Sequence, residues 1–442
     1  MMDLRYGSVG HIIEISDEGI TNLEKSGRII ILEKTMNWKE LQNITPQVIQ
    51  AECDATPEEV NYAEERLEVL NRHIQSLIDE KMIVSGSYCL WRHGKVFADA
   101  ALGNLAREWH GRTKFMPDTL FEIQSITKVF VALAILKLAE DGILYLRQPV
   151  HEWIDEFDAD EFRDITIVQL LTHTSGLCAL PGILADDDRI WWKAIDEERV
   201  KETWISAAVN AGLHAKPGEK WIYSAVGFPI LGEIIERATG IKMDQFIREN
   251  IIIPCDMTET HWRIHTTEEW IKRYNIANST ELKMASEYEK IGLKALARPS
   301  YRWWKEVPDA SGGIVSTSRE MVKLGEMMLR DGCYRGRRVI GKTALSYLWT
   351  NLVGDHIVDS CWGHPDLPVR YGAGMAISTH NTDLEQILSE NVILHEGSGT
   401  SVFMVDRQED FVAMFQMSFP EENGWNHKAV KGTASIIWSG IQ

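Results

Sequence analysis

The alternation of hydrophobic and polar positions predicts a helix and then a hairpin in the first quarter of the chain. Apolar residues recur at helical spacing from Thr56 to Ile83, which predicts a helix with Thr56 as its N-cap. The runs 87–91 and 96–98 have the composition of strands. The short polar turn 92–95 between these two runs predicts that they pair as a β-hairpin.

A second helix begins near residue 125 and is apolar on almost every side. Its apolar residues are Val129, Phe130, Leu133, Ile135, Leu136 and Leu138. A helix without a polar face is typical of the interior of a large core. From about residue 164 to residue 305 the sequence is helical and rich in loops, with turn signals at 217–219 and 238–240.

Strand patterns return near the C-terminus, in the runs 374–377, 401–405 and 411–415. Strands at both ends of a chain, with helices between them, predict an α+β fold. In this fold one antiparallel sheet built from both termini is flanked by helices, and an all-helical subdomain lies beside it. The candidate site is expected between these two parts.

The domain organisation follows from the same pattern. Residues 1–55 show no dominant period and are predicted to form an N-terminal extension. The remaining residues, 56–442, are predicted to form one catalytic domain, because a chain of 442 residues that is 44% hydrophobic can bury a large core. Its α/β part is expected at about 56–120 and 306–442, and its helical part at about 121–305.

The charge and cysteine content narrow the classes of partner and the compartment. A formal net charge of −19 disfavours nucleic acid and anionic membranes as partners. The sequence starts without a basic and apolar signal and contains no run of about 18 apolar residues, so neither secretion nor a membrane span is expected. Six scattered cysteines without a C-x-x-C pair favour free thiols. Together these features predict a cytoplasmic protein.

The first candidate for chemistry is the pair Ser125 and Lys128. Residues three apart lie on one face of a helix, so the lysine amine can reach the serine hydroxyl. Burial drives a lysine toward its neutral form, which can accept the hydroxyl proton and so activate a weak nucleophile. The alternative is a surface helix cap. The apolar helix that follows, and the absence of a second Ser-x-x-Lys in the sequence, favour the catalytic interpretation.

Two further segments carry candidate functional groups. Tyr223, in Tyr223-Ser224-Ala225, is a phenol that would ionise more easily near a lysine and could move protons; the alternative is an ordinary buried tyrosine. The segment His395-Glu396-Gly397-Ser398-Gly399 has small residues that let a strand edge approach a substrate, with the Ser398 N–H free to donate. Its alternative is a glycine-rich turn between strands.

These three segments together resemble the motifs of the serine β-lactamase and penicillin-binding protein superfamily. Their order and spacing are most similar to the class C β-lactamase-like group, which includes esterases and D-amino-acid peptidases. The segments 165–177, 216–240 and 311–317 are also similar to this family, so the resemblance covers roughly residue 57 to the end.

The resemblance implies a role for each residue. Ser125 would form an acyl-enzyme, with Lys128 and Tyr223 as coupled base and acid. The backbone N–H groups of Ser125 and Ser398 would form the oxyanion hole. His395 and Gly397 would line the strand edge beside the site, with His395 where many relatives carry lysine.

Two departures from the family pattern bear on the substrate. Ala225 replaces the asparagine whose amide holds an amide-bearing substrate, and His395 is mostly neutral near pH 7. Both changes shift the expectation from antibiotics and peptidoglycan toward carboxylic esters or lactones. An acyltransferase, a β-lactamase or D-amino-acid peptidase, and a non-catalytic binding module are the alternatives.

Sixteen tryptophans suggest a bulky, apolar substrate. The doublets Trp191-Trp192 and Trp303-Trp304 are the candidate pocket residues, because adjacent side chains do not easily bury in one core. His261 and His265 have a zinc-like spacing but no evident third ligand, so neither metal nor cofactor is expected. The expected partner is a small-molecule ester or lactone, with a homo-oligomer as a candidate assembly.

Overall fold

The computed structural model describes most of the chain, including every strand and helix named below. The described residues are 38–109, 112–177, 205, 208–209, 212–224, 226–262, 270, 273–274, 308–359, 368–380, 385–397, 401–418 and 427–442. Among them, no helix combines the length and apolar character that crossing a membrane requires.

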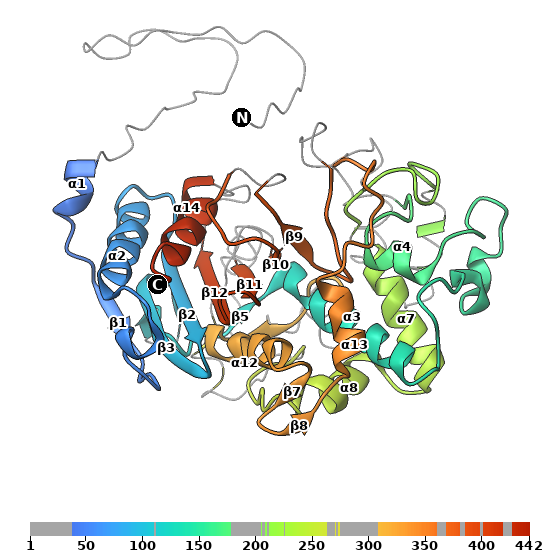
Figure 1. Cartoon of the computed structure of the whole chain (residues 1–442), viewed down its shortest axis with the longest axis horizontal. Coiled ribbons are helices and arrows are strands. Elements are labelled where there is room, and N and C mark those ends of the chain that lie inside the picture. The colour runs from blue at the N-terminus through green and yellow to red at the C-terminus, as the bar shows by residue number, and fades with distance from the viewer. Residues whose placement is uncertain are drawn as a thin grey trace, which may run out of the picture.

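An antiparallel sheet built from both ends of the chain forms the framework (Figure 1). Its strand order is β1-β3-β2-β12-β11-β10-β9, and β4 attaches to β3. The N-terminal strands are β1 (Val48–Gln50), β2 (Ser85–Arg92), β3 (Lys95–Trp109) and β4 (Arg112–Lys114). The C-terminal strands are β9 (Ala376–Ser378), β10 (Val392–Gly397), β11 (Ser401–Asp406) and β12 (Phe411–Ser418). The predicted α+β class is confirmed, and β12 joins the two halves by pairing with β2.

The predicted hairpin is confirmed as β2 and β3. Only His93 and Gly94 separate the strands, with φ of 51° and 89°. Two consecutive residues with positive φ match the twist of a two-residue hairpin, and glycine adopts this conformation without strain. Strand β1 pairs with β3, so residues 48–50 of the predicted extension form part of the sheet.

Both faces of the sheet are buried because helices cover each of them. On one face lie α2 (Glu64–Asp79) and α14 (His427–Trp438); on the other lies α12 (Ser318–Leu329) (Figure 1). Successive β2 residues point to opposite faces, so Tyr88 joins the hydrophobic cluster under α2 and Cys89 the larger cluster that includes α12. The strands are therefore apolar at consecutive positions.

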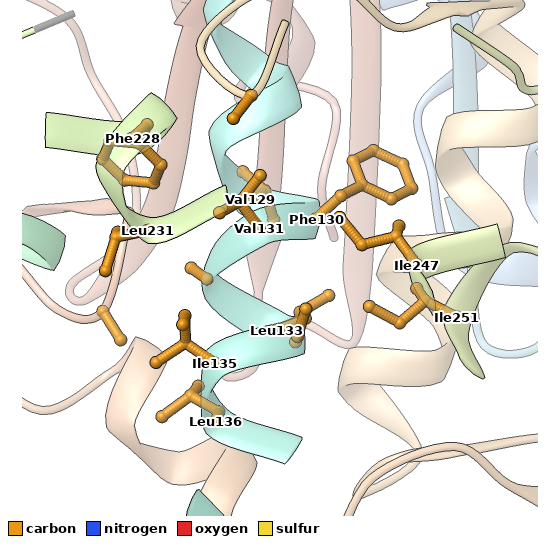
Figure 2. Close-up of a cluster of buried hydrophobic side chains, with 14 of the residues drawn as sticks. Val129, Phe130, Val131, Leu133, Ile135, Leu136, Phe228, Leu231, Ile247 and Ile251 are labelled. Atoms are coloured by element: carbon orange, nitrogen blue, oxygen red, sulfur yellow. The ribbon is translucent and has the colours of Figure 1, made fainter. Parts of the chain in front are cut away.

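Helix α3 (Thr127–Glu140) is the buried helix predicted from the sequence. Every side chain from Thr127 to Leu136 is buried. Figure 2 shows Phe228 and Leu231 of α7 (Gly227–Thr239) on one side of α3 and Ile247 of α8 (Met243–Ile247) on another. Other described elements are α1 (Trp38–Gln42), α4 (Ile167–Leu171), α13 (Lys342–Leu345), β5 (Phe121–Glu122), β6 (Val315–Ser316), β7 (Cys333–Tyr334) and β8 (Arg337–Arg338).

The first predicted helix starts later than its sequence pattern indicates. A short 3₁₀ turn occupies Glu58–Val60, and α2 begins at Glu64. Between them Asn61 has a φ of 54°, and the buried Tyr62 donates from its hydroxyl to the Ile437 carbonyl at 2.8 Å. Packing of Tyr62 against the C-terminal helix therefore interrupts the helix that the local sequence pattern predicts from Thr56 onward. The prediction of Thr56 as N-cap of this helix was wrong.

Candidate active site

Ser125 lies in a 3₁₀ turn (Gln124–Ile126) that leads directly into α3. The turn is held on two sides. The Ile123 N–H donates to the Ile314 carbonyl at 2.9 Å, and the Ser401 hydroxyl donates to the Ile123 carbonyl at 3.2 Å. Gln124 has a φ of 51°, which a non-glycine residue seldom adopts. The surrounding elements therefore hold the Ser125 hydroxyl in a defined position.

Lys128 lies one turn further on, with its side chain buried. Its Nζ donates to Ser125 Oγ at 3.0 Å and to the Ser311 carbonyl at 2.6 Å. Burial lowers the pKa of the lysine to about 7, although the nearby Asp309 carboxylate opposes this change. Near neutral pH a large fraction of Lys128 is therefore uncharged and can accept a proton.

Two residues without a predicted role, Asp309 and Ser311, hold this lysine. The backbone N–H and hydroxyl of Ser311 both donate to Asp309 Oδ1, at 2.7 and 2.8 Å. This arrangement turns the Ser311 carbonyl toward Lys128. Burial raises the pKa of Asp309, while the Ser311 hydrogen bonds and Lys128 act in the opposite direction. The only sequence signal was the family-like segment 311–317.

Tyr223 lies beside both Lys128 and Ser125, so the structure brings all three predicted groups together. Lys128 Nζ lies 5.1 Å from the centre of the Tyr223 ring. A hydrogen bond with Ser125 lowers the pKa of the phenol, but burial raises it by more. Tyr223 therefore stays protonated, contrary to the expectation that a nearby lysine would ease its ionisation. A protonated phenol is suited to donating a proton.

His395 and Gly397 lie on β10, whose end runs beside the Ser125 turn. His395 is buried, and its Nδ1–H donates to the Glu396 carbonyl at 2.9 Å. Burial and the positive charge of Lys128 lower the pKa of His395 to about 3, so this position carries no cation at neutral pH. The ring centre of His395 is 6.3 Å from that of Tyr223.

Gly397 permits the close approach of β10 to the Ser125 turn. A Cβ at this position would lie 2.5 Å from the Ile123 carbonyl oxygen and would also collide with Ser401 Oγ. Neither contact is sterically allowed, so a larger residue must separate the strand from the turn. The expectation that small residues let this strand edge approach a substrate stays a prediction; the contact that the structure gives Gly397 is with the Ser125 turn.

Replacing Gly397 by alanine is expected to lower kcat/KM about 100-fold, because a shift of about 1 Å at a reacting group has an effect of this size. Steady-state rates on an activated ester measure the effect. Gly432→Ala, in α14, is the control for a glycine substitution, because its added Cβ would make only ordinary contacts of 3.4 and 3.5 Å with the His73 ring. Wild-type activity in Gly397→Ala would contradict the proposed steric requirement.

Several predicted site residues lie outside the described residues. They are Ser398, Ala225, Trp191, Trp192, Trp303 and Trp304. The second oxyanion donor and the tryptophan pocket therefore stay predictions. His261 Nε2 is hydrogen-bonded to the Tyr274 hydroxyl at 2.7 Å, whereas His265 also lies outside. Within the described part of the chain, no group of three or more His, Cys, Asp or Glu side chains could hold a metal ion.

Comparison with known proteins places this geometry in a family. A family model described as Beta-lactamase matches residues 70–428. Penicillin-binding protein 4* of Bacillus subtilis is 31% identical over 197 residues, which cover 43% of this chain and 41% of that protein. The chain thus spans about two fifths of the length of such curated relatives.

Solved structures share the fold at low identity. EstCE1, a hydrolase with promiscuous acyltransferase activity, has a TM-score of 0.67 at 19% identity, covering 85% of this chain and 99% of that one. The octameric penicillin-binding protein homologue from Pyrococcus abyssi has a TM-score of 0.61 at 22% identity, covering 83% and 75%. At these identities the similarity establishes the fold.

Proposed function

This chain belongs to the beta-lactamase family, and from that membership we propose that it is a serine hydrolase that cleaves a carboxylic ester or lactone through an acyl-enzyme on Ser125. The observation that carries the proposal is the buried amine of Lys128, 3.0 Å from Ser125 Oγ. A buried lysine with a pKa of about 7 beside a hydroxyl has the properties of a general base.

In the proposed acylation step, protons move among three side chains. Neutral Lys128 takes the Ser125 hydroxyl proton as Oγ forms a bond to the carbonyl carbon. The resulting oxyanion accepts hydrogen bonds from the backbone N–H of Ser125 and, as proposed, of Ser398. The bond to the leaving oxygen then breaks, Tyr223 gives that oxygen its proton, and Lys128 returns a proton to the phenol. Water repeats the sequence in reverse to release the acid.

The charges around the site support the proposed substrate class. His395 is neutral at physiological pH, so it offers no fixed cation to a substrate carboxylate. The nearby Lys431 forms an ion pair with Glu396 at 3.0 Å. An uncharged acyl group therefore suits this position better than the carboxylate of a β-lactam. The tryptophan doublets support a bulky, apolar acyl group.

A matched pair of esters tests this assignment. We expect p-nitrophenyl butyrate to be hydrolysed with a kcat/KM about 30-fold or more above that of mono-p-nitrophenyl succinate, because an unpaired buried charge costs about 2 kcal/mol or more. His395→Lys is expected to narrow or reverse the preference. A lactone and a chromogenic β-lactam extend the panel. Preference for the carboxylate-bearing ester or the β-lactam would contradict the ester assignment.

Assembly and location stay predictions. Octameric assembly is described for the Pyrococcus abyssi homologue, and we propose that this chain also self-associates. We keep the proposal of a cytoplasmic location, of a cofactor-free mechanism and of one catalytic domain, which we extend to residues 48–50 because β1 pairs with β3. Measurement of the molecular mass in solution tests the proposed self-association directly.

A further inference from the structure

His173, which follows α4, packs directly against the ring of Tyr223. The two ring centres are 4.3 Å apart, with an angle of 35° between the planes. His173 is buried and has a φ of 58°, a backbone conformation that only some non-glycine residues adopt readily. The proposed mechanism assigns no step to this histidine. That mechanism therefore explains neither the positive φ of His173 nor its position beside the phenol.

Two hydrogen bonds tie His173 to the residues on either side of Tyr223. The Ile222 N–H donates to the His173 carbonyl at 2.9 Å. The Ser224 N–H donates to the His173 ring at Nδ1, at 3.0 Å. The backbone on both sides of Tyr223 is therefore held by one residue, while the ring of that residue lies against the phenol.

The second of these hydrogen bonds fixes the protonation state of His173. A backbone N–H can only donate, so Nδ1 must be an unprotonated acceptor and Nε2 carries the single ring proton. A cationic ring would point one N–H group at another. Burial, and to a smaller extent the positive charge of Lys128, lower the pKa of His173, which keeps the ring neutral. Both hydrogen bonds between His173 and the neighbours of Tyr223 are therefore kept over the physiological pH range.

We propose that His173 is a positioning residue that holds the Tyr223 hydroxyl where it can protonate the leaving group. The inference rests on the proposed function, because it uses the proton donation assigned to Tyr223. A positioning role differs from simple core packing in one respect. In the acylation step, which determines kcat/KM, it affects only those reactions whose leaving group needs a proton.

Two esters of the same acid separate these roles. The p-nitrophenolate of a p-nitrophenyl ester leaves without a proton, whereas the alkoxide of an ethyl ester needs one. We expect His173→Gly to lower kcat/KM for the ethyl ester at least tenfold more than for the p-nitrophenyl ester, because general acid catalysis contributes about 10²–10⁴-fold. Equal losses on both esters would overturn the proposal.

Matched variants control for the backbone. Glycine and asparagine both tolerate positive φ, but only asparagine supplies an oxygen that can accept from the Ser224 N–H. His173→Asn is therefore expected to recover most of the ethyl-ester activity that His173→Gly loses. His93→Gly removes another positive-φ histidine, in the exposed hairpin turn, and is expected to leave activity unchanged.

A double mutant shows whether His173 acts through Tyr223. We expect Tyr223→Phe with His173→Gly to lose no more ethyl-ester activity than Tyr223→Phe alone, since there is no hydroxyl left to position. Additive losses would overturn the proposal.

A readout without substrate separates this inference from the proposed function. In ring-labelled tyrosine NMR spectra, the signal that Tyr223→Phe removes should move in His173→Gly and return toward its place in His173→Asn. An unmoved signal would overturn the positioning role even if Ser125 is the nucleophile. A moved signal with no Ser125-dependent hydrolysis would support the contact and reject the proposed function.

Discussion

Replacing Ser125 by alanine is expected to lower kcat/KM for a carboxylic ester by about 10⁴-fold or more, a loss typical of removing a serine nucleophile. The hydroxyl is the only group in the proposed mechanism that forms a bond to the substrate. In that mechanism Lys128 and Tyr223 move protons and form no bond to the substrate. Initial rates and the release of product in the first turnover, measured on the same ester, quantify the loss.

The control for this variant is a serine outside the site. Ser439, at the end of α14, donates to the Ile436 carbonyl and contacts no site residue named above. Ser439→Ala is expected to keep wild-type rates. Thermal unfolding of both variants shows that each is folded. If Ser125→Ala kept activity within tenfold of the wild type, a non-catalytic role or another nucleophile would be the better explanation.

Replacing Lys128 by arginine is expected to lower kcat/KM by about 10²–10⁴-fold, the usual contribution of a general base. A guanidinium stays protonated at every accessible pH, so it cannot accept the Ser125 proton. Lys128→Met removes the amine altogether and should show a similar loss. Rates for both variants on p-nitrophenyl butyrate, beside the wild type, measure the effect.

The dependence of kcat/KM on pH shows whether the protonated or the deprotonated form of Lys128 is active. Its pKa is lowered to about 7, and the active form is the deprotonated one, so wild-type kcat/KM should rise with pH and reach half its plateau near 7. The pKa of Tyr223 is raised, so ionisation of the phenol should not lower activity below about pH 10. A profile that is flat from pH 5 to pH 9, or an active Lys128→Arg, would contradict this role.

The parts of the fold that could be predicted from the sequence are those fixed by local pattern. The β2–β3 hairpin follows from the short turn around Gly94, and the buried α3 from its continuous apolar character. The start of α2 could not be predicted, because it depends on Tyr62 packing against a helix about 375 residues away. Sequence periodicity contains no information about such contacts.

The candidate site, too, could be predicted only where local sequence pattern determines it. The Ser125–Lys128 pair follows from helical spacing. For Tyr223, only the family resemblance favoured a catalytic role over that of an ordinary buried tyrosine, since nothing local marks a catalytic tyrosine. Its ionisation was predicted in the wrong direction because burial, which dominates, depends on tertiary packing. His173 lies inside the family-like segment 165–177, whereas Asp309 lies just before the segment 311–317 and was not marked by it. Asp309 influences Lys128 and His173 packs against Tyr223, and sequence pattern does not reveal such contacts between distant segments.

The measurement that tests the central claim most directly is trapping of the acyl-enzyme. The protein is mixed with a slowly hydrolysed p-nitrophenyl ester, quenched in acid, and examined by intact-mass and peptide mass spectrometry. We predict one added acyl group, located on Ser125 and absent from Ser125→Ala. An acyl group on a different residue, or continued hydrolysis by Ser125→Ala at the wild-type rate, would contradict the account.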